Sequence, residues 1–169
     1  TLAAEELAAL ISKLRASFDF SAVSEFTVEA GRPDTITEEK LKALQKGGVT
    51  RISINPQTME DHVLSAIGRR HTAEDIQKAY FLARRHCTGL INMDLIAGLP
   101  EDTAEGFCKT LDEVIALGPE NITVHTLSLK KGSFITLEKT AIPGENAVSQ
   151  MLDYAARRLR AEGYRPYYL

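Results

Sequence analysis

Polar side chains stand at or near the end of four strand-like segments of this sequence. They are Glu29, Asn55 with Gln57 just beyond it, Asp94 and His125. Carboxylate and amide oxygens accept hydrogen bonds from hydroxyl and ammonium groups, and amide nitrogens donate them. Parallel α/β folds build their binding sites at the C-terminal ends of the strands. The four segments therefore predict one shared site for a small polar ligand.

Each of these segments alternates apolar and polar side chains. The segments span residues 25–30, 51–55, 91–96 and 121–127. In the second, Ile52 and Ile54 alternate with Ser53 and Asn55, so the strand has one apolar and one polar face. Parallel strands covered by helices on both faces are nearly continuous apolar runs instead. The alternation predicts an open barrel with a polar concave side that holds a ligand. A polar face that is simply exposed to solvent is the alternative.

Helical spacing of apolar residues predicts the elements between the strands. The expected helices cover residues 3–18, 35–46, 59–67 and 146–162, with two more that begin after Thr72 and at Asp102 or Thr103. We expect Thr35 and Glu38 to form a capping box, and Pro56 to end the second strand. Helices between successive strands favour right-handed βαβ units and a parallel sheet. Residues 167–169 are predicted to begin a further strand.

The composition limits the classes of protein. With 169 residues and a formal net charge of −3, we expect one domain or part of one, without the basic surface that binds nucleic acid. No apolar run approaches the roughly 20 residues of a membrane helix, so we expect a cytoplasmic protein with no membrane partner. Cys87 and Cys108 match neither a disulfide framework nor a metal-ligand spacing. His62, His71 and His86 lack such spacing too, so no metal site is predicted.

Several segments resemble proteins of the radical S-adenosylmethionine (radical SAM) superfamily. They are residues 25–30 (EFTVEA), 51–57 (RISINPQ), 68–72 (GRRHT) and 92–100 (NMDLIAGLP). Their order and spacing are similar to the oxygen-independent coproporphyrinogen III oxidase type. Residues 121–133 (NITVHTLSLKKGS) look closest to the coproporphyrinogen dehydrogenase branch of that family. The resemblance covers nearly the whole chain.

The resemblance implies an α/β fold that is part of a six-stranded open barrel. Residues 1–169 would supply four parallel strands, the third to the sixth, and thus the C-terminal two-thirds of a radical SAM barrel domain. The first two strands, with the C-x-x-x-C-x-x-C loop that holds a 4Fe–4S cluster, would lie upstream, and a further C-terminal region downstream. Cys87 and Cys108 do not match that motif. We therefore expect this chain alone to hold no cofactor, to be inactive, and to self-associate through the exposed barrel edge.

The resemblance also implies a set of binding residues. Glu29 and Asp94 would accept hydrogen bonds from the ribose hydroxyls or the ammonium of SAM, with Gln57 as a neutral amide. Arg69 would pair with the SAM carboxylate in a bidentate geometry. The substrate of the family, coproporphyrinogen III, carries four carboxylates, and its candidate contacts here are Arg51, Arg70, Lys130 and Lys131. No residue is assigned a catalytic role.

The function implied by the resemblance belongs to the full-length protein. It is the anaerobic oxidative decarboxylation of coproporphyrinogen III to protoporphyrinogen IX in haem biosynthesis, by a radical derived from SAM at the cluster. Two alternatives remain open. One is a haem-binding carrier or chaperone of the same family, and the other is an α/β interaction domain without a small ligand.

Overall fold

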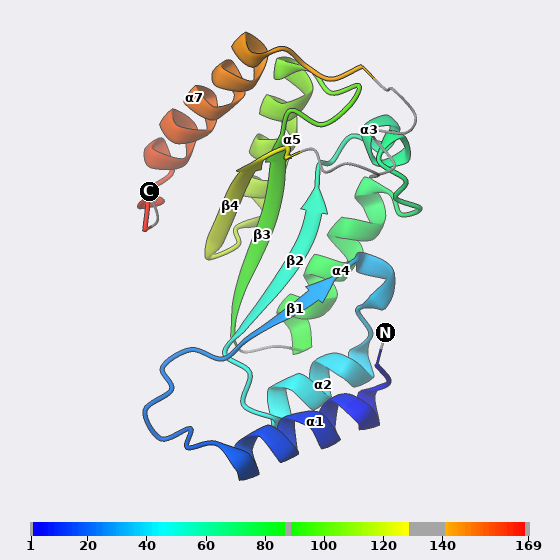
Figure 1. The fold of residues 1–169 in the computed structure, drawn as a ribbon, viewed down its shortest axis with the longest axis vertical. Helices are drawn as coiled ribbons and strands as arrows, with labels where there is room; N and C mark the ends of the chain where they lie inside the picture. The colour runs from blue at the N-terminus through cyan, green and yellow to red at the C-terminus, as the bar shows by residue number, and fades with distance from the viewer. Residues whose placement is uncertain (1, 87–88, 129–140, 168–169) are drawn as a thin grey trace.

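The alternating segments form one sheet of four parallel strands (Figure 1). The computed structural model describes residues 2–86, 89–128 and 141–167. The strands are β1 (Thr27–Gly31), β2 (Arg51–Gln57), β3 (Leu90–Ala97) and β4 (Asn121–Thr126), and they pair in that order. Every pairing is parallel. The predicted α/β fold, with four parallel strands in sequence order, is confirmed.

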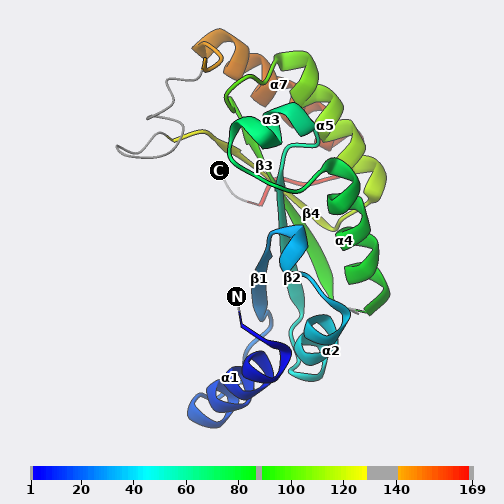
Figure 2. The same cartoon turned by 90° about the vertical axis from the view of Figure 1, so that its right-hand side faces the viewer.

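Most of the helices lie along one side of this sheet, and α1 (Ala4–Ser17) lies beyond the N-terminal ends of the strands (Figure 2). The others are the short 3-10 helix η1 (Pro33–Thr35), α2 (Glu38–Lys46), α3 (Asp61–Ala66), α4 (Ala73–His86), α5 (Ala104–Leu117) and α7 (Glu145–Ala161). Figure 2 shows α2, α3, α4 and α5 on the same side of the strands. α1 packs against α2, and α7 packs against α5 and reaches β3 and β4. None of the helices in the described ranges is both long and apolar enough to cross a membrane.

The apolar half of each strand faces these helices. Ile54, Met93 and Leu95 are fully buried and belong to one core with Ile76 of α4 and Phe107 of α5. Burial of a side chain of this size contributes about 1.5–3 kcal/mol. The alternating pattern thus places the helices on the apolar face and leaves the polar face of the sheet to the site.

The start of α2 differs from the prediction. Its N-cap is Thr37, whose hydroxyl accepts a hydrogen bond from the N–H of Lys40 at 3.4 Å. Thr35 instead ends η1, and its hydroxyl lies 2.7 Å from the carbonyl of Ala30. The capping box expected at Thr35 is therefore wrong. The physical reason is Pro33, whose fixed φ favours the first position of a short helical turn and separates that turn from α2.

The end of β2 also differs from the prediction, because the strand continues through Pro56 to Gln57. Ile54 pairs with Met93 and Gln57 pairs with Leu95, so β2 contains one extra residue in a bulge. Proline has no N–H to donate, and a bulge is a position where a strand tolerates that loss. Pro56 therefore does not end the strand. The bulge places Gln57 at the C-terminal end of β2, beside the polar face.

Two expected helix starts agree with the structure. At α4, the N–H and the hydroxyl of Thr72 both donate to Asp75 at 3.0 Å, and the N–H of Asp75 lies 3.3 Å from the Thr72 hydroxyl. At α5, the N-cap is Thr103, whose hydroxyl accepts from the N–H of Gly106. The reciprocal cap of α4 and the single cap of α5 satisfy N–H groups that the first turn of a helix leaves without partners.

The C-terminal segment crosses back to the start of β4. The hydroxyl of Tyr164 donates to the carbonyl of Pro119 at 2.7 Å. Tyr167 is exposed and not in a strand, while residues 168 and 169 of the expected strand lie outside the described residues. Cys87 lies outside them too.

Asp102, in the turn before α5, is a buried carboxylate with an incomplete set of partners. It is 6 % exposed, and one of its oxygens accepts from the N–H of Thr103 at 2.8 Å. The other, Oδ2, has no hydrogen-bond partner among the described residues. Burial raises the pKa of Asp102, and the charge of Glu60 raises it further against the lowering effect of the Thr103 hydrogen bond.

We predict that Asp102→Asn stabilises the protein at neutral pH. A carboxyl group whose pKa is raised by folding contributes to the free energy of unfolding. This contribution is complete below the pKa of the unfolded state and is lost as the pH rises through the pKa of the folded state. An asparagine keeps an acceptor for Thr103 and does not titrate. The free energy of unfolding should therefore rise by about 1 kcal/mol at pH 7, and the gain should shrink near pH 4. Denaturant titrations at both pH values measure this, with exposed Asp153→Asn as the control. An equal gain at both pH values would contradict the burial argument.

Candidate functional site

The polar face carries a hydrogen-bond network that begins at β1. The amide nitrogen of Asn55, on β2, donates to Oε2 of Glu29, on β1, at 3.1 Å. The hydroxyl of Ser53 lies 3.1 Å from the amide oxygen of Asn55 on the same strand. Residues two positions apart on a strand share a face, so the alternation seen in the sequence places Ser53 and Asn55 side by side.

The network continues across β3 to β4. Nδ2 of Asn92 lies 2.7 Å from Oδ1 of Asp94 and 2.8 Å from the hydroxyl of Ser53. Ser53 also lies 3.4 Å from Oδ2 of Asp94. The hydroxyl of Thr123, on β4, donates to the amide oxygen of Asn92 at 3.0 Å. One connected set of polar side chains therefore spans all four strands. We call it the polar-face network; its members are Glu29, Ser53, Asn55, Asn92, Asp94 and Thr123.

The centre of this network is buried and its two carboxylates are more accessible. Ser53 is 1 % exposed and Asn92 is 7 % exposed, whereas Asp94 is half-buried and Glu29 is exposed. Among the described residues, Oε1 of Glu29 has no hydrogen-bond donor, and Oδ2 of Asp94 has only the long contact to Ser53. Each acid therefore keeps acceptor capacity for a ligand hydroxyl or ammonium group.

Gln57 lies at the C-terminal end of β2 in a strained conformation. Its φ is 71°, in the left-handed region, and its side chain is 8 % exposed. Its amide nitrogen is 3.5 Å from the carbonyl of Asn55, at the limit of a hydrogen bond. Such a backbone costs about 1–3 kcal/mol and is concentrated at functional sites. The bulge thus holds an amide beside the polar-face network, as a ligand site there would require.

Arg69, in the loop between α3 and α4, is half-buried beside other charged groups. Burial lowers its pKa, as does the charge of Arg32, and Asp34 opposes both effects. His71 is also buried, its Nε2 has no partner among the described residues, and burial followed by the charge of Arg69 lowers its pKa. The charge of Arg32 thus repels that of Arg69, and the carboxylate of Asp34 opposes this effect. An anion would relieve this repulsion, and a carboxylate can be held by arginine in a bidentate geometry.

The structure thus brings Glu29 and Asp94 into one network and places Gln57 next to it. Arg69 belongs to a second cluster with Arg32 and Asp34, both of which follow β1 in the chain. No hydrogen bond joins the two groups among the described residues. The binding roles of all four residues remain predictions.

The candidate substrate contacts are distributed differently. Arg51 is the first residue of β2 and lies about 20 Å from Gln57, the last residue of that extended strand. Its guanidinium pairs with Glu25 at 2.9 Å and donates to Thr27 at 3.1 Å. Arg70 is exposed. Lys130 and Lys131 lie outside the described residues.

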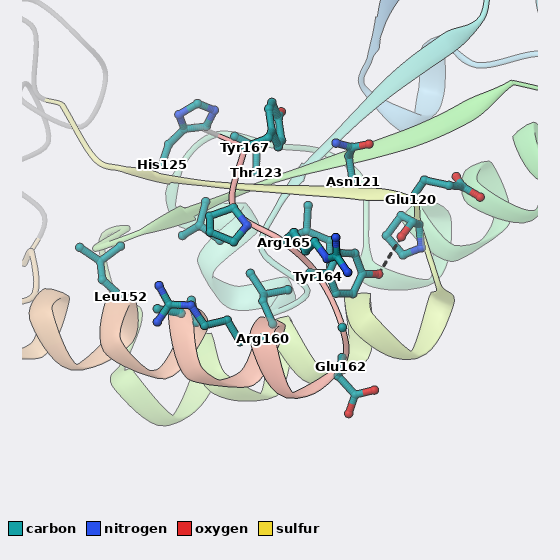
Figure 3. Close-up of a pocket in the computed structure, with 18 residues that line it drawn as sticks. Glu120, Asn121, Thr123, His125, Leu152, Arg160, Glu162, Tyr164, Arg165 and Tyr167 are labelled. Carbon is teal, nitrogen blue, oxygen red and sulfur yellow. Dashed lines mark hydrogen bonds between the residues drawn. The ribbon is translucent and has the colours of Figure 1, made fainter. Parts of the chain in front are cut away.

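A large cavity lies along the edge of β4, and Thr123 of the polar-face network is one of its lining residues. It has a volume of about 940 Å³ and is lined by β4, α7 and residues 164–167 (Figure 3). Figure 3 shows Thr123 and His125 on the opposite side of β4 from Leu152 of α7. None of the four predicted cofactor residues lines this cavity. The hydrogen-bonding groups of the polar face, and not the size of the cavity, therefore identify that face as the candidate site.

Sequence reasoning missed the supporting members of the network. Ser53, Asn92 and Thr123 were placed on the polar face by the alternation, but no function was assigned to them. Their type and their shared face were visible in the sequence. The sequence did not reveal the pairing register, which puts Ser53 opposite Asn92 and Asp94 opposite Thr123.

Comparison with known proteins identifies the family. A model described as the radical SAM superfamily matches residues 2–114, which is more than half of the chain. The chain belongs to the radical SAM superfamily. It is 48% identical, over its whole length, to the oxygen-independent coproporphyrinogen-III oxidase-like protein HemZ of Bacillus subtilis (strain 168). The heme chaperone HemW of the same organism is 32% identical over 87% of the chain.

A solved structure of the superfamily shows the same arrangement of elements. Coproporphyrinogen III oxidase (HemN) from Escherichia coli, a radical SAM enzyme, superposes with a TM-score of 0.85 at 28% identity over 97% of this chain. The chain spans only 34% of HemZ, 40% of the Bacillus HemW and 38% of the HemN chain. The predicted membership of the radical SAM superfamily is confirmed, and the activity of the whole protein belongs to the proposal below.

The two cofactors of radical SAM proteins fit this chain unequally. The free oxygens of Glu29 and Asp94, the amide of Gln57 and the cation of Arg69 suit the hydroxyl, ammonium and carboxylate groups of SAM. A 4Fe–4S cluster is held by cysteine thiolates, and this sequence has two cysteines in all. No group of three His, Cys, Asp or Glu side chains that could hold a metal is found in the described part of the chain. The residues present do not fit the cluster.

Proposed function

We propose that this chain is the C-terminal two-thirds of the barrel of a radical SAM enzyme that converts coproporphyrinogen III to protoporphyrinogen IX. The observation that supports this most is the 48% identity, over the whole chain, to a coproporphyrinogen-III oxidase-like protein. The fold likeness to HemN, a coproporphyrinogen III oxidase, supports the same substrate class. We place the protein in the cytoplasm and take the porphyrinogen as its small-molecule partner.

In this proposal the polar face positions SAM. Glu29 and Asp94 accept hydrogen bonds from its ribose hydroxyls or its ammonium, and Gln57 contributes a neutral amide. Arg69 pairs with its carboxylate, which offsets the repulsion between Arg69 and Arg32. SAM, when bound at a reduced cluster, supplies the radical chemistry. The role of this chain is to orient the cofactor and to exclude water from it.

A second candidate function is haem binding for delivery to other proteins. The relatives that favour it are heme chaperones HemW, 28–32% identical over 87–97% of this chain. The oxidase-like relative matches more closely. The interaction domain without a ligand is disfavoured by the polar-face network, whose two carboxylates keep acceptor capacity toward the open side of the sheet.

The full-length protein distinguishes the two functions. It is loaded with its cluster under anaerobic conditions and given a one-electron reductant, SAM and coproporphyrinogen III. We expect protoporphyrinogen IX, measured as protoporphyrin by chromatography after oxidation, and a lower rate for the Asp94→Asn variant when SAM is limiting. A wild-type protein that binds haem in a one-to-one ratio but forms no product would overturn the oxidase proposal in favour of the chaperone.

A further inference from the structure

The polar-face network has a direction that follows from donor and acceptor chemistry. A carboxylate only accepts hydrogen bonds, so the group of Asn92 that lies 2.7 Å from Asp94 is its amide nitrogen. The amide oxygen of Asn92 then faces Thr123 at 3.0 Å, and the Thr123 hydroxyl must be the donor. Asp94 thereby fixes which way the Asn92 amide points, and Thr123 donates to the amide oxygen on the other side.

The same reasoning extends to the other acid. The second N–H of Asn92 points at the Ser53 hydroxyl, 2.8 Å away, which therefore accepts from it. Ser53 has one proton to donate, and its contact to Asn55, at 3.1 Å, is shorter than its contact to Asp94, at 3.4 Å. Asn55 accepts through its oxygen and donates through its nitrogen to Glu29 at 3.1 Å. Thr123, Asn92 and Ser53 thus each have an acceptor for every proton they donate, and Asn55 donates one of its two N–H groups to Glu29.

The result is a directed chain that begins at one hydroxyl on β4 and ends on two carboxylates. One branch runs from Thr123 through Asn92 to Asp94, and the other from Asn92 through Ser53 and Asn55 to Glu29. Ser53 and Asn92 are buried, where a wrongly turned Asn92 amide would leave polar atoms without partners at about 1–3 kcal/mol each. The polar-face network as a whole therefore disfavours alternative rotamers of both Asp94 and Glu29.

We propose that Thr123 and Asn92 are positioning residues for the cofactor site, acting through Asp94 and Glu29. By occupying Oδ1 of Asp94 and Oε2 of Glu29, the network orients the remaining oxygens of the two acids toward one ligand. This proposal rests on the proposed function, in which those acids bind SAM. Neither Thr123 nor Asn92 contacts the cofactor in this account.

The test is calorimetric titration of SAM into the full-length, cluster-loaded protein. Thr123→Val keeps the shape of the side chain and removes the donor, so the dissociation constant should rise about fivefold, the effect of losing one neutral hydrogen bond. Thr123→Ser restores the hydroxyl and should restore the affinity to within about twofold of wild type. Thr126→Val makes the same chemical change on the same strand outside the network and should leave the affinity unaltered.

A double-mutant cycle separates positioning from a general effect on the fold. If Thr123 acts in part through Asp94, then Thr123→Val in the Asp94→Asn background should change the affinity by clearly less than the roughly fivefold expected in the wild-type background, because the two effects are not additive. Equal fold-changes in both backgrounds would overturn the positioning role, as would failure of Thr123→Ser to restore binding. Iron content and the thermal midpoint of each variant confirm that cluster and fold are intact.

The outcomes also separate this inference from the proposed function. If Asp94→Asn weakens SAM binding and Thr123→Val does not, the cofactor site stands and the positioning role is wrong. If neither variant changes the affinity, Asp94 is not in the cofactor site, and both its binding role and the positioning role of Thr123 are wrong, whereas the oxidase function is decided by product formation.

Discussion

Replacing Asp94 by Asn should weaken SAM binding to the full-length, cluster-loaded protein by about tenfold or more. Asp94 accepts from Asn92 through Oδ1 and keeps Oδ2 for a ligand. In the variant, the amide oxygen would stay with Asn92, and the amide nitrogen would take the place of the free oxygen. A donor would then face the hydroxyl or ammonium of SAM. A charge-assisted hydrogen bond contributes roughly 1.5–3 kcal/mol, which corresponds to at least that loss of affinity.

The control must show that this loss is specific to the site. Asp153→Asn removes the same charge from an exposed position on α7 and should leave the dissociation constant unchanged. Calorimetry on both variants, at matched iron content, gives the comparison. An Asp94→Asn protein that binds SAM within about twofold of wild type would remove Asp94 from the cofactor site.

The fold was predictable because its main signal is local. A strand exposes alternate side chains on opposite faces, so Ile52 and Ile54 could be assigned to the core and Ser53 and Asn55 to the other face from sequence alone. The same period put Asp94 on the polar face. These assignments need no knowledge of which strands are neighbours.

What could not be predicted depends on how the strands and loops meet. The bulge that carries β2 through Pro56 to Gln57 exists only in the pairing with β3. Thr37, and not Thr35, caps α2 because Pro33 forms a separate turn. The closeness of Arg69 to Arg32 joins two loops that are 37 residues apart in the chain. Local patterns contain none of this information.

The second large effect concerns the cluster. We predict that Cys87 and Cys108 can both be replaced by Ser in the full-length protein without loss of the 4Fe–4S cluster. The ligands of the cluster are thiolates. Cys108 is half-buried on α5, and because burial raises its pKa, the protonated thiol is favoured over the thiolate. The two cysteines of this chain are also fewer than the three of the C-x-x-x-C-x-x-C loop that the family resemblance implies.

Iron and sulfide analysis, with the visible spectrum, measures the cluster in the double variant and in wild type after anaerobic reconstitution. Residues 1–169 alone, treated in the same way, should take up no stoichiometric cluster, because the proposal places every thiolate ligand in the remainder of the protein. The two measurements check each other. A full-length double variant that loses its cluster, or an isolated chain that gains one, would show that a cysteine of this segment is a ligand. The cluster site would then have to include Cys87 or Cys108, and the placement of every cluster ligand outside this chain would be wrong.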